Sequence, residues 1–366
     1  MSAYILSACR SPVAPRGGAL ATLLPHDLAR PVLLAALSRA GVTPDMVDEV
    51  IISNALGAGG NPARVIALGA GLPERIAGLS IDRQCAGGMD ALLLARQMIR
   101  SGDADVVVAG GVESYSRRPI RMQTFADARP PLAYDQAPFT PWPDRDPDMS
   151  VAADALAKSL NITRQAQDEW AMASHAKALA NPVTASEVIT VNGLDRDAFT
   201  RALSPALCRR AASITGNITA ANAAVAADAA AFCVVVSERI LKCLNAPKIE
   251  IIAGATIGGT PDFPGLAPLA AIAKIMDKTG LGPTNLAAAE IMEAYAVQAI
   301  ACVQGANLNP KIVNQGGGAL ARGHPVGASG SINAVRLFHT LRMTGGTGLA
   351  AIAAAGGIGT ALILRA

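Results

Sequence analysis

The sequence predicts an α/β protein in which two related halves pack together and an inserted loop domain separates them along the chain. The same order of predicted strands and helices occurs twice, once near each end. The composition fits this class, because 51% of the residues are hydrophobic and only 3% are aromatic, which is typical of tightly packed α/β layers. We assign 1–114 plus 222–246 to the first half, 115–221 to the inserted loop domain and 247–366 to the second half.

The first half alternates predicted strands and helices. Runs of apolar and β-branched residues indicate strands, whereas apolar residues with helical spacing indicate helices. In chain order we expect a strand at 4–12, a helix at 30–42, a short helix and a strand within 43–55, a strand at 74–84, a helix at 87–102 and a strand at 104–111. Gly41 would end the first of these helices.

The second half repeats this order. Its expected elements are a strand at 248–256, a helix at 269–281, a short helix and a strand within 282–296, a strand at 310–318, a helix at 329–342 and a strand at 348–357. Each half alone would leave a helix layer exposed, so the two should pack as a pseudo-twofold pair. Their facing helix starts would then converge, which would bring Cys85 and His324 together.

The inserted loop domain differs from the two halves in its amino-acid composition. Its first part, to about residue 150, is rich in proline and charge, and 151–180 is strongly helical with a break and N-cap at 161–163. We expect it to lie over the mouth of the core. The segment 222–240, which we interpret as a buried helix running into a strand, would return the chain to the first half.

Charge and aromatic content argue against a nucleic-acid partner. The formal net charge is only +3, and few aromatic side chains are present to stack on bases. Arg117, Arg118 and Arg121 form a local basic cluster that could meet phosphates, although a solvated loop is the more common role of such a cluster.

The chain should be soluble and cytoplasmic. The N-terminus lacks a basic start followed by a long apolar stretch, and we find no uninterrupted apolar segment that would span a membrane. The six cysteines show no CxxC spacing and most lie in apolar runs, which fits buried free thiols in a reducing compartment. No His, Cys and carboxylate set has metal-ligand spacing, so no metal is expected.

Cys85 is the candidate nucleophile. It stands between a predicted strand and a predicted helix, and Ala86, Gly87 and Gly88 keep the turn compact. A helix N-terminus stabilises a thiolate, and the first-turn amides can bind a thioester oxyanion. A structural cysteine is the alternative, but this context favours a nucleophile.

His324 is the candidate base, because it lies in a glycine-rich loop and is followed by Pro325. The alternative is an ordinary surface-loop histidine. The other three histidines lack a glycine setting, and we expect them on helices: solvent-side residues His26 and His175, and the helix-face residue His339. A thiol and an imidazole of this kind suit acyl transfer through a cysteine thioester.

The glycine-rich run at 323–330 could also be taken for a phosphate loop. It lacks the Gly-Lys-Ser/Thr ending of an NTP-binding loop, and neither glycine cluster has the GxGxxG spacing of a dinucleotide-binding turn. Nucleotide hydrolysis and hydride transfer are therefore poor hypotheses.

These segments resemble the thiolase family over essentially the whole chain. RQCAGG at 83–88 resembles the family's nucleophilic-cysteine motif, and NQGGGALARGHPVGASG at 314–330 is similar to its histidine motif. The stretch 149–178 resembles the helical part of the inserted loop domain, and 215–224 the turn that leads out of it.

The resemblance implies a thiolase fold, coenzyme A thioesters as small-molecule substrates, and no further cofactor. It also implies a homodimer or homotetramer, with a hetero-complex as a possibility, and ping-pong acyl transfer. Cys85 would take the acyl group and contribute its amide to an oxyanion hole, while His324 would activate the thiol and help to bind the thioester oxygen.

The chain departs from the family pattern at the second acid/base. Relatives carry a cysteine in a Cys-x-Gly-Gly-Gly turn, where this chain has Ala353, and Ala355 replaces a glycine that donates an oxyanion-hole amide. Met292 replaces an Asn or His at the start of a second motif, 292–295. Losing one donor costs about 10²- to 10³-fold in rate, and losing an acid/base group costs about 10²- to 10⁴-fold. Carbon–carbon bond chemistry should therefore be impaired.

The resemblance also implies the substrate-binding positions, which are Met149, Ala224, Phe263 and Tyr295. Ala224 stands where relatives commonly have a serine that contacts pantetheine. No clear match exists for the arginine that contacts the nucleotide phosphate, although Arg209 and Arg210 lie nearby in sequence.

Three functional hypotheses remain open from the sequence. The first is a thiolase-like acyltransferase that forms an acyl-Cys85 intermediate. The second is an acyl-thioester hydrolase, or one acyltransferase subunit of a complex. The third is a thiolase-fold scaffold without catalysis.

Overall fold

The computed structural model describes residues 2–244 and 248–366. The first half comprises β1 (Ala3–Arg10), β2 (Ala14–Pro15), α1 (Pro25–Ala40), β3 (Glu49–Ser53), α2 (Pro62–Gly69), β4 (Leu79–Ile81), α3 (Gly87–Ser101), β5 (Val106–Ser114), β10 (Ala227–Ser237) and α7 (Glu238–Cys243). The second half comprises β11 (Ile249–Gly258), α8 (Ala267–Thr279), β12 (Leu286–Ile291), α9 (Ala296–Gly305), α10 (Ala319–Arg322), α11 (Val326–Thr344), β13 (Thr347–Ala354) and β14 (Ile358–Arg365).

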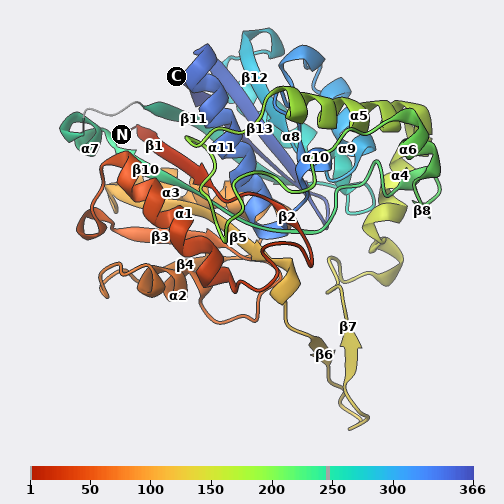
Figure 1. The fold of residues 1–366 in the computed structure, drawn as a ribbon, viewed down its shortest axis with the longest axis horizontal. Coiled ribbons are helices and arrows are strands. Elements are labelled where there is room, and N and C mark those ends of the chain that lie inside the picture. The colour runs from red at the N-terminus through yellow and green to blue at the C-terminus, as the bar shows by residue number, and fades with distance from the viewer. Residues whose placement is uncertain (1, 245–247) are drawn as a thin grey trace.

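The segment between β5 and β10 holds shorter elements: β6 (Arg121–Gln123), β7 (Leu132–Tyr134), α4 (Met149–Ser159), α5 (Arg164–Ala180), α6 (Pro205–Arg210), β8 (Ser213–Thr215) and β9 (Ile218–Thr219). The β6–β7 hairpin projects from the body of the molecule (Figure 1). Seven 3-10 turns complete the described chain: η1 (Pro44–Met46), η2 (Gln84–Ala86), η3 (Tyr115–Arg117), η4 (Pro143–Arg145), η5 (Pro264–Leu266), η6 (Pro283–Asn285) and η7 (Pro310–Ile312).

One mixed sheet joins the two halves. Its strand order is β12-β13-β14-β11-β1-β10-β5-β3-β4, and β2 pairs with β10 off this path. The halves meet where β1 and β11 pair antiparallel, through Tyr4 opposite Glu250 and Ile5 opposite Ile249. Read outward from this junction, β1, β10, β5 and β3 of one half correspond to β11, β14, β13 and β12 of the other. The internal repeat expected from the sequence is therefore present.

The two central helices α3 and α11 pack against each other and are shared by both halves. Their apolar residues join one core with inward-facing side chains of β5 and β10 and with those of β13 and β14. The opposite faces of the strands pack on α1 and α2 in the first half and on α8 and α9 in the second. This layering is that of the thiolase fold, and it places the N-terminal ends of α3 and α11 beside each other.

The prediction for 222–240 is wrong in its first part. No helix precedes the strand there, and residues 227–237 all belong to β10. Alanine has the highest intrinsic helix propensity, but β10 is a central strand that pairs with β1 on one side and β5 on the other. Its small side chains let α1 and α11 pack on its two faces, so tertiary structure overrides local propensity.

Two other elements and the position of one side chain differ from the sequence predictions. The strand expected at 74–84 is only the three-residue edge strand β4, and the strand expected at 310–318 is reduced to a single bridge between Ala289 and Val313. His175 was expected on the solvent side of its helix, but it is buried against Phe199, and its Nδ1 accepts a hydrogen bond from Arg201 N–H at 3.3 Å. The chain that returns after α5 covers this face, and burial lowers the pKa of His175 to about 4.

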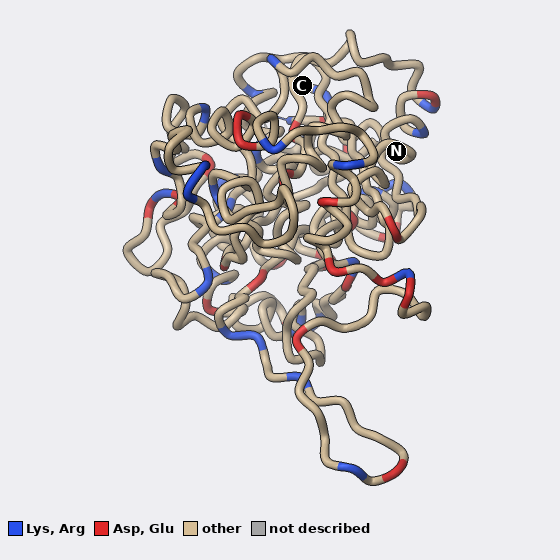
Figure 2. Tube along the Cα trace, turned by 90° about the vertical axis from the view of Figure 1, so that its right-hand side faces the viewer, with Lys and Arg blue, Asp and Glu red and all other residues tan. Residues whose placement is uncertain are grey.

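The domain boundaries remain predictions, and the expected boundary at 246 and 247 lies outside the described residues. Basic and acidic residues are interspersed over the chain (Figure 2). Within the described ranges, no helix combines the length and the apolar character that crossing a membrane requires.

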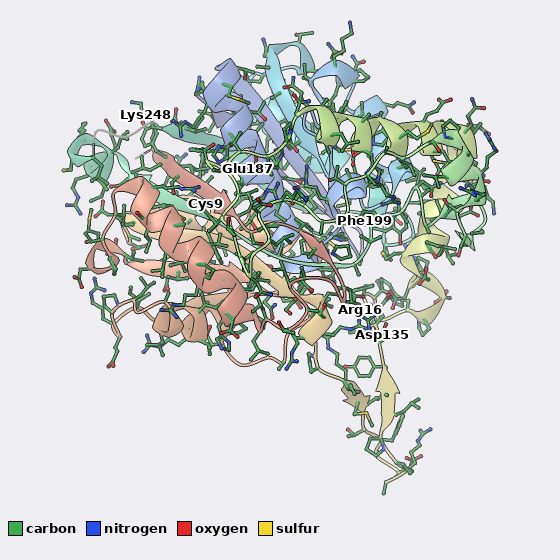
Figure 3. The ribbon with its side chains drawn as sticks, in the orientation of Figure 1. Cys9, Arg16, Asp135, Glu187, Phe199 and Lys248 are labelled. Carbon is green, nitrogen blue, oxygen red and sulfur yellow. The ribbon has the colours of Figure 1, made fainter. Side chains whose placement is uncertain are left out.

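A buried ion network ties the inserted segment to both halves. Glu187, labelled in Figure 3, accepts hydrogen bonds from Arg10 at 2.6 Å and from Arg336 at 2.7 Å. Arg10 also makes a two-point contact with Asp197 at 2.7 and 2.9 Å. Burial alone would raise the pKa of Glu187, but the two guanidinium groups outweigh it and hold the pKa at about 2.

Candidate active site

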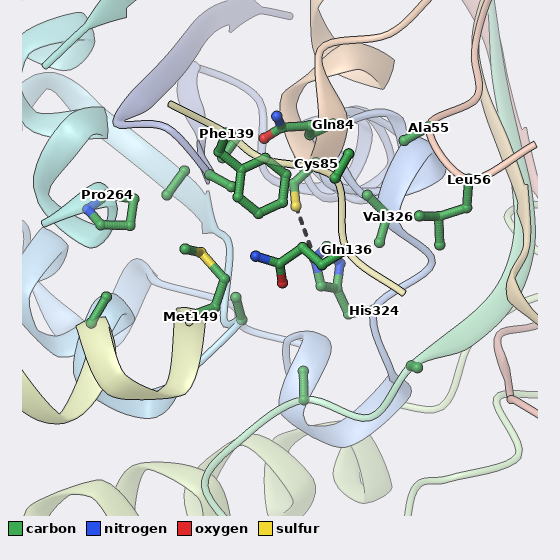
Figure 4. A pocket seen from close by; sticks show the side chains of 18 of the residues that line it. Ala55, Leu56, Gln84, Cys85, Gln136, Phe139, Met149, Pro264, His324 and Val326 are labelled. Atoms are coloured by element: carbon green, nitrogen blue, oxygen red, sulfur yellow. Dashed lines mark hydrogen bonds between the residues drawn. The ribbon is translucent and has the colours of Figure 1, made fainter. Parts of the chain in front are cut away.

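Cys85 and His324 meet although 239 positions separate them in the chain. Cys85 lies in the η2 turn immediately before α3, and His324 lies just before α11. Cys85 Sγ is 3.1 Å from His324 Nε2 (Figure 4). This distance suits direct proton transfer between thiol and imidazole.

Glycine makes the close approach of these two turns possible. A Cβ atom at Gly88, in the first turn of α3, would lie 2.7 Å from Ser331 N and 2.9 Å from Gly327 O. The starts of α3 and α11 could not approach so closely with a larger residue there. Gly323, immediately before His324, has φ +116°, a conformation that favours glycine, and a Cβ there would lie 2.8 Å from the Ala227 side chain.

Ser329 is the hydrogen-bond partner of His324 Nδ1. Its hydroxyl donates to Pro325 O at 3.0 Å, and its oxygen is 2.6 Å from His324 Nδ1. A hydroxyl group has one hydrogen, so both contacts are hydrogen bonds only in the tautomer in which Nδ1–H donates to Ser329 Oγ. In that tautomer the unprotonated Nε2 faces the Cys85 thiol, as a general base requires.

Glu113 holds the histidine loop against the first half. Its carboxylate, at the end of β5, accepts hydrogen bonds from Gly327 N–H at 2.9 Å and from Asn54 Nδ2 at 2.8 Å. It also accepts from the backbone N–H groups of Ala55 at 3.1 Å and Leu56 at 3.3 Å. Burial raises the pKa of Glu113 to about 7 against these donors.

The resting pair is neutral. Burial raises the pKa of Cys85 to about 12 and lowers the pKa of His324 to about 4. From the sequence we expected a thiolate stabilised by a helix N-terminus, whereas these pKa shifts favour the neutral thiol. Burial of the thiol is the largest cause of this rise, and the carboxylates of Glu113 and Asp82 add to it.

A cavity of about 530 Å³ opens at this pair. Figure 4 shows Cys85, His324, Met149, Gln136 and Phe139 around it. Seven of the nine positions predicted from the sequence line the cavity: Cys85, Met149, Ala224, Tyr295, His324, Ala353 and Ala355. Met292 is buried in the core around α3 and α11, and Phe263 packs on an apolar cluster with Leu156 and Val297, so neither of them lines the cavity.

Comparison with known proteins decides the family. The family model described as "Thiolase, N-terminal domain" matches residues 3–239 of this chain, and the one described as "Thiolase, C-terminal domain" matches residues 245–366. This chain belongs to the thiolase family. YhfS of Bacillus subtilis, provisionally named an acetyl-CoA C-acetyltransferase, is 38% identical over 378 residues, which cover 100% of this chain and 99% of the relative.

Solved thiolase-family structures share the fold over the full length. The crystal structure of the Bacillus anthracis acetyl-CoA acetyltransferase has a TM-score of 0.90 at 32% identity and covers 100% of this chain and 98% of the other. The structure of Acat5 thiolase from Ascaris suum in complex with coenzyme A has a TM-score of 0.92 at 30% identity and covers 100% of both chains.

The basic cluster lies partly at the rim of this thiolase cavity. Arg118 and Arg121 line it, and Arg117 does not. The Arg118 guanidinium lies 4.5 Å from the ring centroid of Tyr115 and pairs with Asp135 at 2.5 Å. Arg118 is thus held in place by an aromatic ring and a carboxylate.

Sequence reasoning missed several groups in and around the site. Ser329 follows His324 by five positions, and the helical spacing of α11 was the one signal that it would turn back toward the imidazole. Gln136 and Phe139 come from the proline-rich segment, where no periodicity exists to place them. Gln298 lines the cavity from the first turn of α9, and its sequence context resembles that of any helix residue.

Proposed function

We propose that this thiolase-family protein is an acyltransferase that receives an acyl group from an acyl-CoA on Cys85, with His324 as the base. The contact that carries the proposal is Cys85 Sγ to His324 Nε2 at 3.1 Å, at the wall of an open cavity. The contact of Nδ1 with Ser329 Oγ at 2.6 Å supports the tautomer that a general base requires. Coenzyme A enters the proposal through the Ascaris suum relative, which was solved with it.

The acylation step follows from the neutral pair. The Cys85 thiol proton moves to His324 Nε2 as the sulfur attacks the thioester carbonyl carbon. We propose that the Cys85 N–H group stabilises the developing oxyanion. Collapse of the tetrahedral intermediate breaks the bond to the coenzyme A sulfur, and the imidazolium returns its proton to that leaving thiolate. The products are acyl-Cys85 and free coenzyme A.

The acceptor in the second step is where this chain departs from its family. Ala353 lines the cavity without a proton-transferring group, and Met292 places a thioether in the core. Acylation needs only the thiol and the base, whereas forming an enolate needs a second acid/base. These two positions favour the second candidate, a thioester hydrolase or an acyltransferase with an acceptor other than acetyl-CoA.

Mass spectrometry of the intact protein tests acylation. Mixing the full chain with acetyl-CoA should add one acetyl group, and peptide mapping should locate it at Cys85. Cys85→Ala should abolish the adduct, and Cys243→Ala, which removes an exposed free thiol, should not. An unmodified wild-type protein at millimolar acetyl-CoA would favour the scaffold hypothesis instead.

Product analysis separates the two enzymatic candidates. Steady release of acetate from acetyl-CoA would indicate hydrolysis, and accumulation of acetyl-Cys85 would indicate a missing acceptor. Rapid cleavage of acetoacetyl-CoA by coenzyme A would instead show that carbon–carbon chemistry survives.

Assembly and location complete the proposal. We propose a homodimer or homotetramer, because large apolar side chains are exposed on and beside the projecting hairpin at Ile120, Met122 and Leu132. A hetero-complex is the alternative, and analytical ultracentrifugation of the purified chain distinguishes them. A reducing cytoplasm fits the six free cysteines.

A further inference from the structure

The cavity wall contains a buried side-chain amide in which only the oxygen has a hydrogen-bond partner. Gln298, in the first turn of α9, is 3% exposed and lines the cavity. Its Oε1 accepts a hydrogen bond from Ala294 N–H at 3.3 Å. Its Nε2 has no hydrogen-bond partner among the described residues.

The orientation of this amide is determined by the backbone. The oxygen and nitrogen of a glutamine side chain are assigned from their partners, and Ala294 N–H is a donor. Only the oxygen can accept from it, so the nitrogen must lie on the other side of the amide. Two N–H bonds are therefore left without an acceptor in a buried place, which costs about 1–3 kcal/mol for such a group.

The surroundings on this side of the cavity are otherwise apolar. Ala152, Ala153 and Leu156 of α4 line it, and Gly265 packs on the Gln298 side chain. In the part of the chain that the structure describes, no carboxylate or backbone carbonyl accepts a hydrogen bond from Gln298 Nε2. A ligand oxygen is the acceptor that the site lacks.

Tyr295 offers a second unused polar group on the same side. It is the N-cap residue of α9, three positions before Gln298, and it also lines the cavity. Residues three apart at a helix start lie on one face. Within the described chain the Tyr295 hydroxyl makes no hydrogen bond to protein, and burial raises its pKa, so the hydroxyl keeps its proton.

We propose that Gln298 and Tyr295 form a polar patch in the acyl-binding part of the cavity and select acyl chains that carry a hydroxyl group. Gln298 Nε2 donates to the hydroxyl oxygen of the ligand, and the Tyr295 hydroxyl accepts from or donates to it. This inference rests on the proposed function in that the ligand is an acyl-CoA. It adds which acyl-CoA: a hydroxyacyl thioester rather than a plain hydrocarbon one.

The selectivity follows from the unpaired amide. A hydrocarbon chain that fills this space displaces water and leaves Nε2 unsatisfied, whereas a hydroxyl group satisfies it. Sites that are built to hydrogen-bond a hydroxyl discriminate strongly against analogues that lack it. Because one amide and one phenol can bond the hydroxyl group, we expect a hydroxyacyl thioester to bind about 10-fold or more tightly than its plain acyl analogue.

Binding and acylation are measured separately to test this. Dissociation constants for butyryl-CoA, 3-hydroxybutyryl-CoA and 4-hydroxybutyryl-CoA are determined by calorimetry in the Cys85→Ala protein, which cannot be acylated there. The same three compounds are then used to follow adduct formation at Cys85 in the wild-type chain. We expect at least one hydroxybutyryl-CoA to bind about 10-fold more tightly than butyryl-CoA.

Variants assign the preference to the patch. In the Cys85→Ala background, Gln298→Met keeps the side-chain length without the donor and should bring the ratio of dissociation constants close to one. Tyr295→Phe, which keeps the ring and its packing, should lower the same ratio and protects the test if Gln298→Met fails to fold. Gln304→Met, an exposed glutamine on the same helix, should leave the ratio unchanged.

The outcomes separate the two proposals. Equal binding of the three thioesters, or a preference that survives both patch variants, would overturn the hydroxyacyl patch whether or not Cys85 is acylated. A hydroxyl preference in binding with no adduct at Cys85 would overturn the acyl-enzyme step and leave the patch standing.

Discussion

Ser329 Oγ lies 2.6 Å from Nδ1 of His324 and 3.0 Å from Pro325 O. Both contacts are hydrogen bonds when Nδ1–H donates to the hydroxyl oxygen, a tautomer that needs no carboxylate partner. The base is therefore oriented by a neutral hydroxyl, which suits a histidine whose pKa burial has lowered to about 4. A nearby carboxylate would favour the imidazolium and raise that pKa.

Replacing Ser329 with alanine should slow acylation without unfolding the protein. The variant loses the acceptor for Nδ1–H, so the imidazole can adopt the other tautomer, with its proton toward the thiol. We expect the rate of acyl-Cys85 formation to fall about 10²-fold, the lower end of what a general base contributes. Single-turnover mass spectrometry measures this rate.

Ser331→Ala is the matched control for this change. Ser331 is buried in the same helix and also donates to a backbone carbonyl, that of Ala328 at 2.8 Å, but it makes no contact with His324. Equal losses of rate in both variants would mean that the Ser329 effect arises from the helix rather than from the tautomer.

The pH dependence of Cys85 chemistry should depend on the reagent. Burial raises the pKa of Cys85 to about 12 and lowers the pKa of His324 to about 4, so the neutral pair predominates between these values. Acylation by a thioester uses this pair and should be lost only as the pH falls through about 4, where Nε2 becomes protonated. Alkylation by iodoacetamide requires the thiolate and should keep rising with pH up to at least pH 9.

Peptide mapping after timed labelling at pH 6 to pH 9 measures the alkylation profile at Cys85. A rate that levels off below pH 7 would show a preformed thiolate and a pair coupled in the opposite sense.

Much of the architecture could be predicted because the relevant signals are local. The helical spacing of α3 and α11 and the glycines at or just before their first turns identify two helix starts, and the repeated order of elements implies that these starts face each other. The Cys85 and His324 pairing follows from that symmetry. The sequence shows glycines at 88 and 323 but not why glycine is needed there. The need arises from close contacts with Ser331 and Ala227, which are distant in the chain.

The sequence predictions were wrong where contacts between residues distant in the chain determine the local structure. The alanine-rich start of β10 looks helical in isolation and becomes a strand because two neighbours pair with it. His175 looks exposed on its helix until the later segment around Phe199 covers it. The raised pKa of Cys85 likewise depends on burial by the assembled cavity, which the turn sequence does not encode.

Restoring the absent thiol should restore carbon–carbon chemistry. Ala353→Cys places a thiol in the cavity wall. We expect this variant to cleave acetoacetyl-CoA with coenzyme A at least about 10²-fold faster than the wild-type chain, because a positioned acid/base contributes that much. A coupled assay of acetyl-CoA formation measures the rate.

Ala353→Ser is the control for this gain. Serine is similar in size to cysteine, but its hydroxyl is far too weak an acid to exchange protons with an enolate near neutral pH. A similar gain with serine would mean that the thiol is not the missing group.

The buried ion network predicts where the fold is most sensitive. Glu187→Gln removes the negative charge between Arg10 and Arg336 and leaves two buried guanidinium groups without it. Breaking a buried pair from one side costs about 3–5 kcal/mol, so the free energy of unfolding from urea titration should fall by that amount at pH 7. Glu238→Gln removes a surface ion pair with Lys242 and should change the free energy of unfolding by less than about 0.5 kcal/mol.

The same variant has a defined pH signature. The two arginines hold the pKa of Glu187 at about 2 against an ordinary value of 4.5, so its stabilisation is fully present above pH 4.5 and is lost as the pH falls through about 2. The stability difference between wild type and Glu187→Gln should therefore be constant from pH 7 to pH 5 and should shrink below pH 4.5. A difference that instead grows on acidification would mean that the carboxylate is not the charge that Arg10 and Arg336 require.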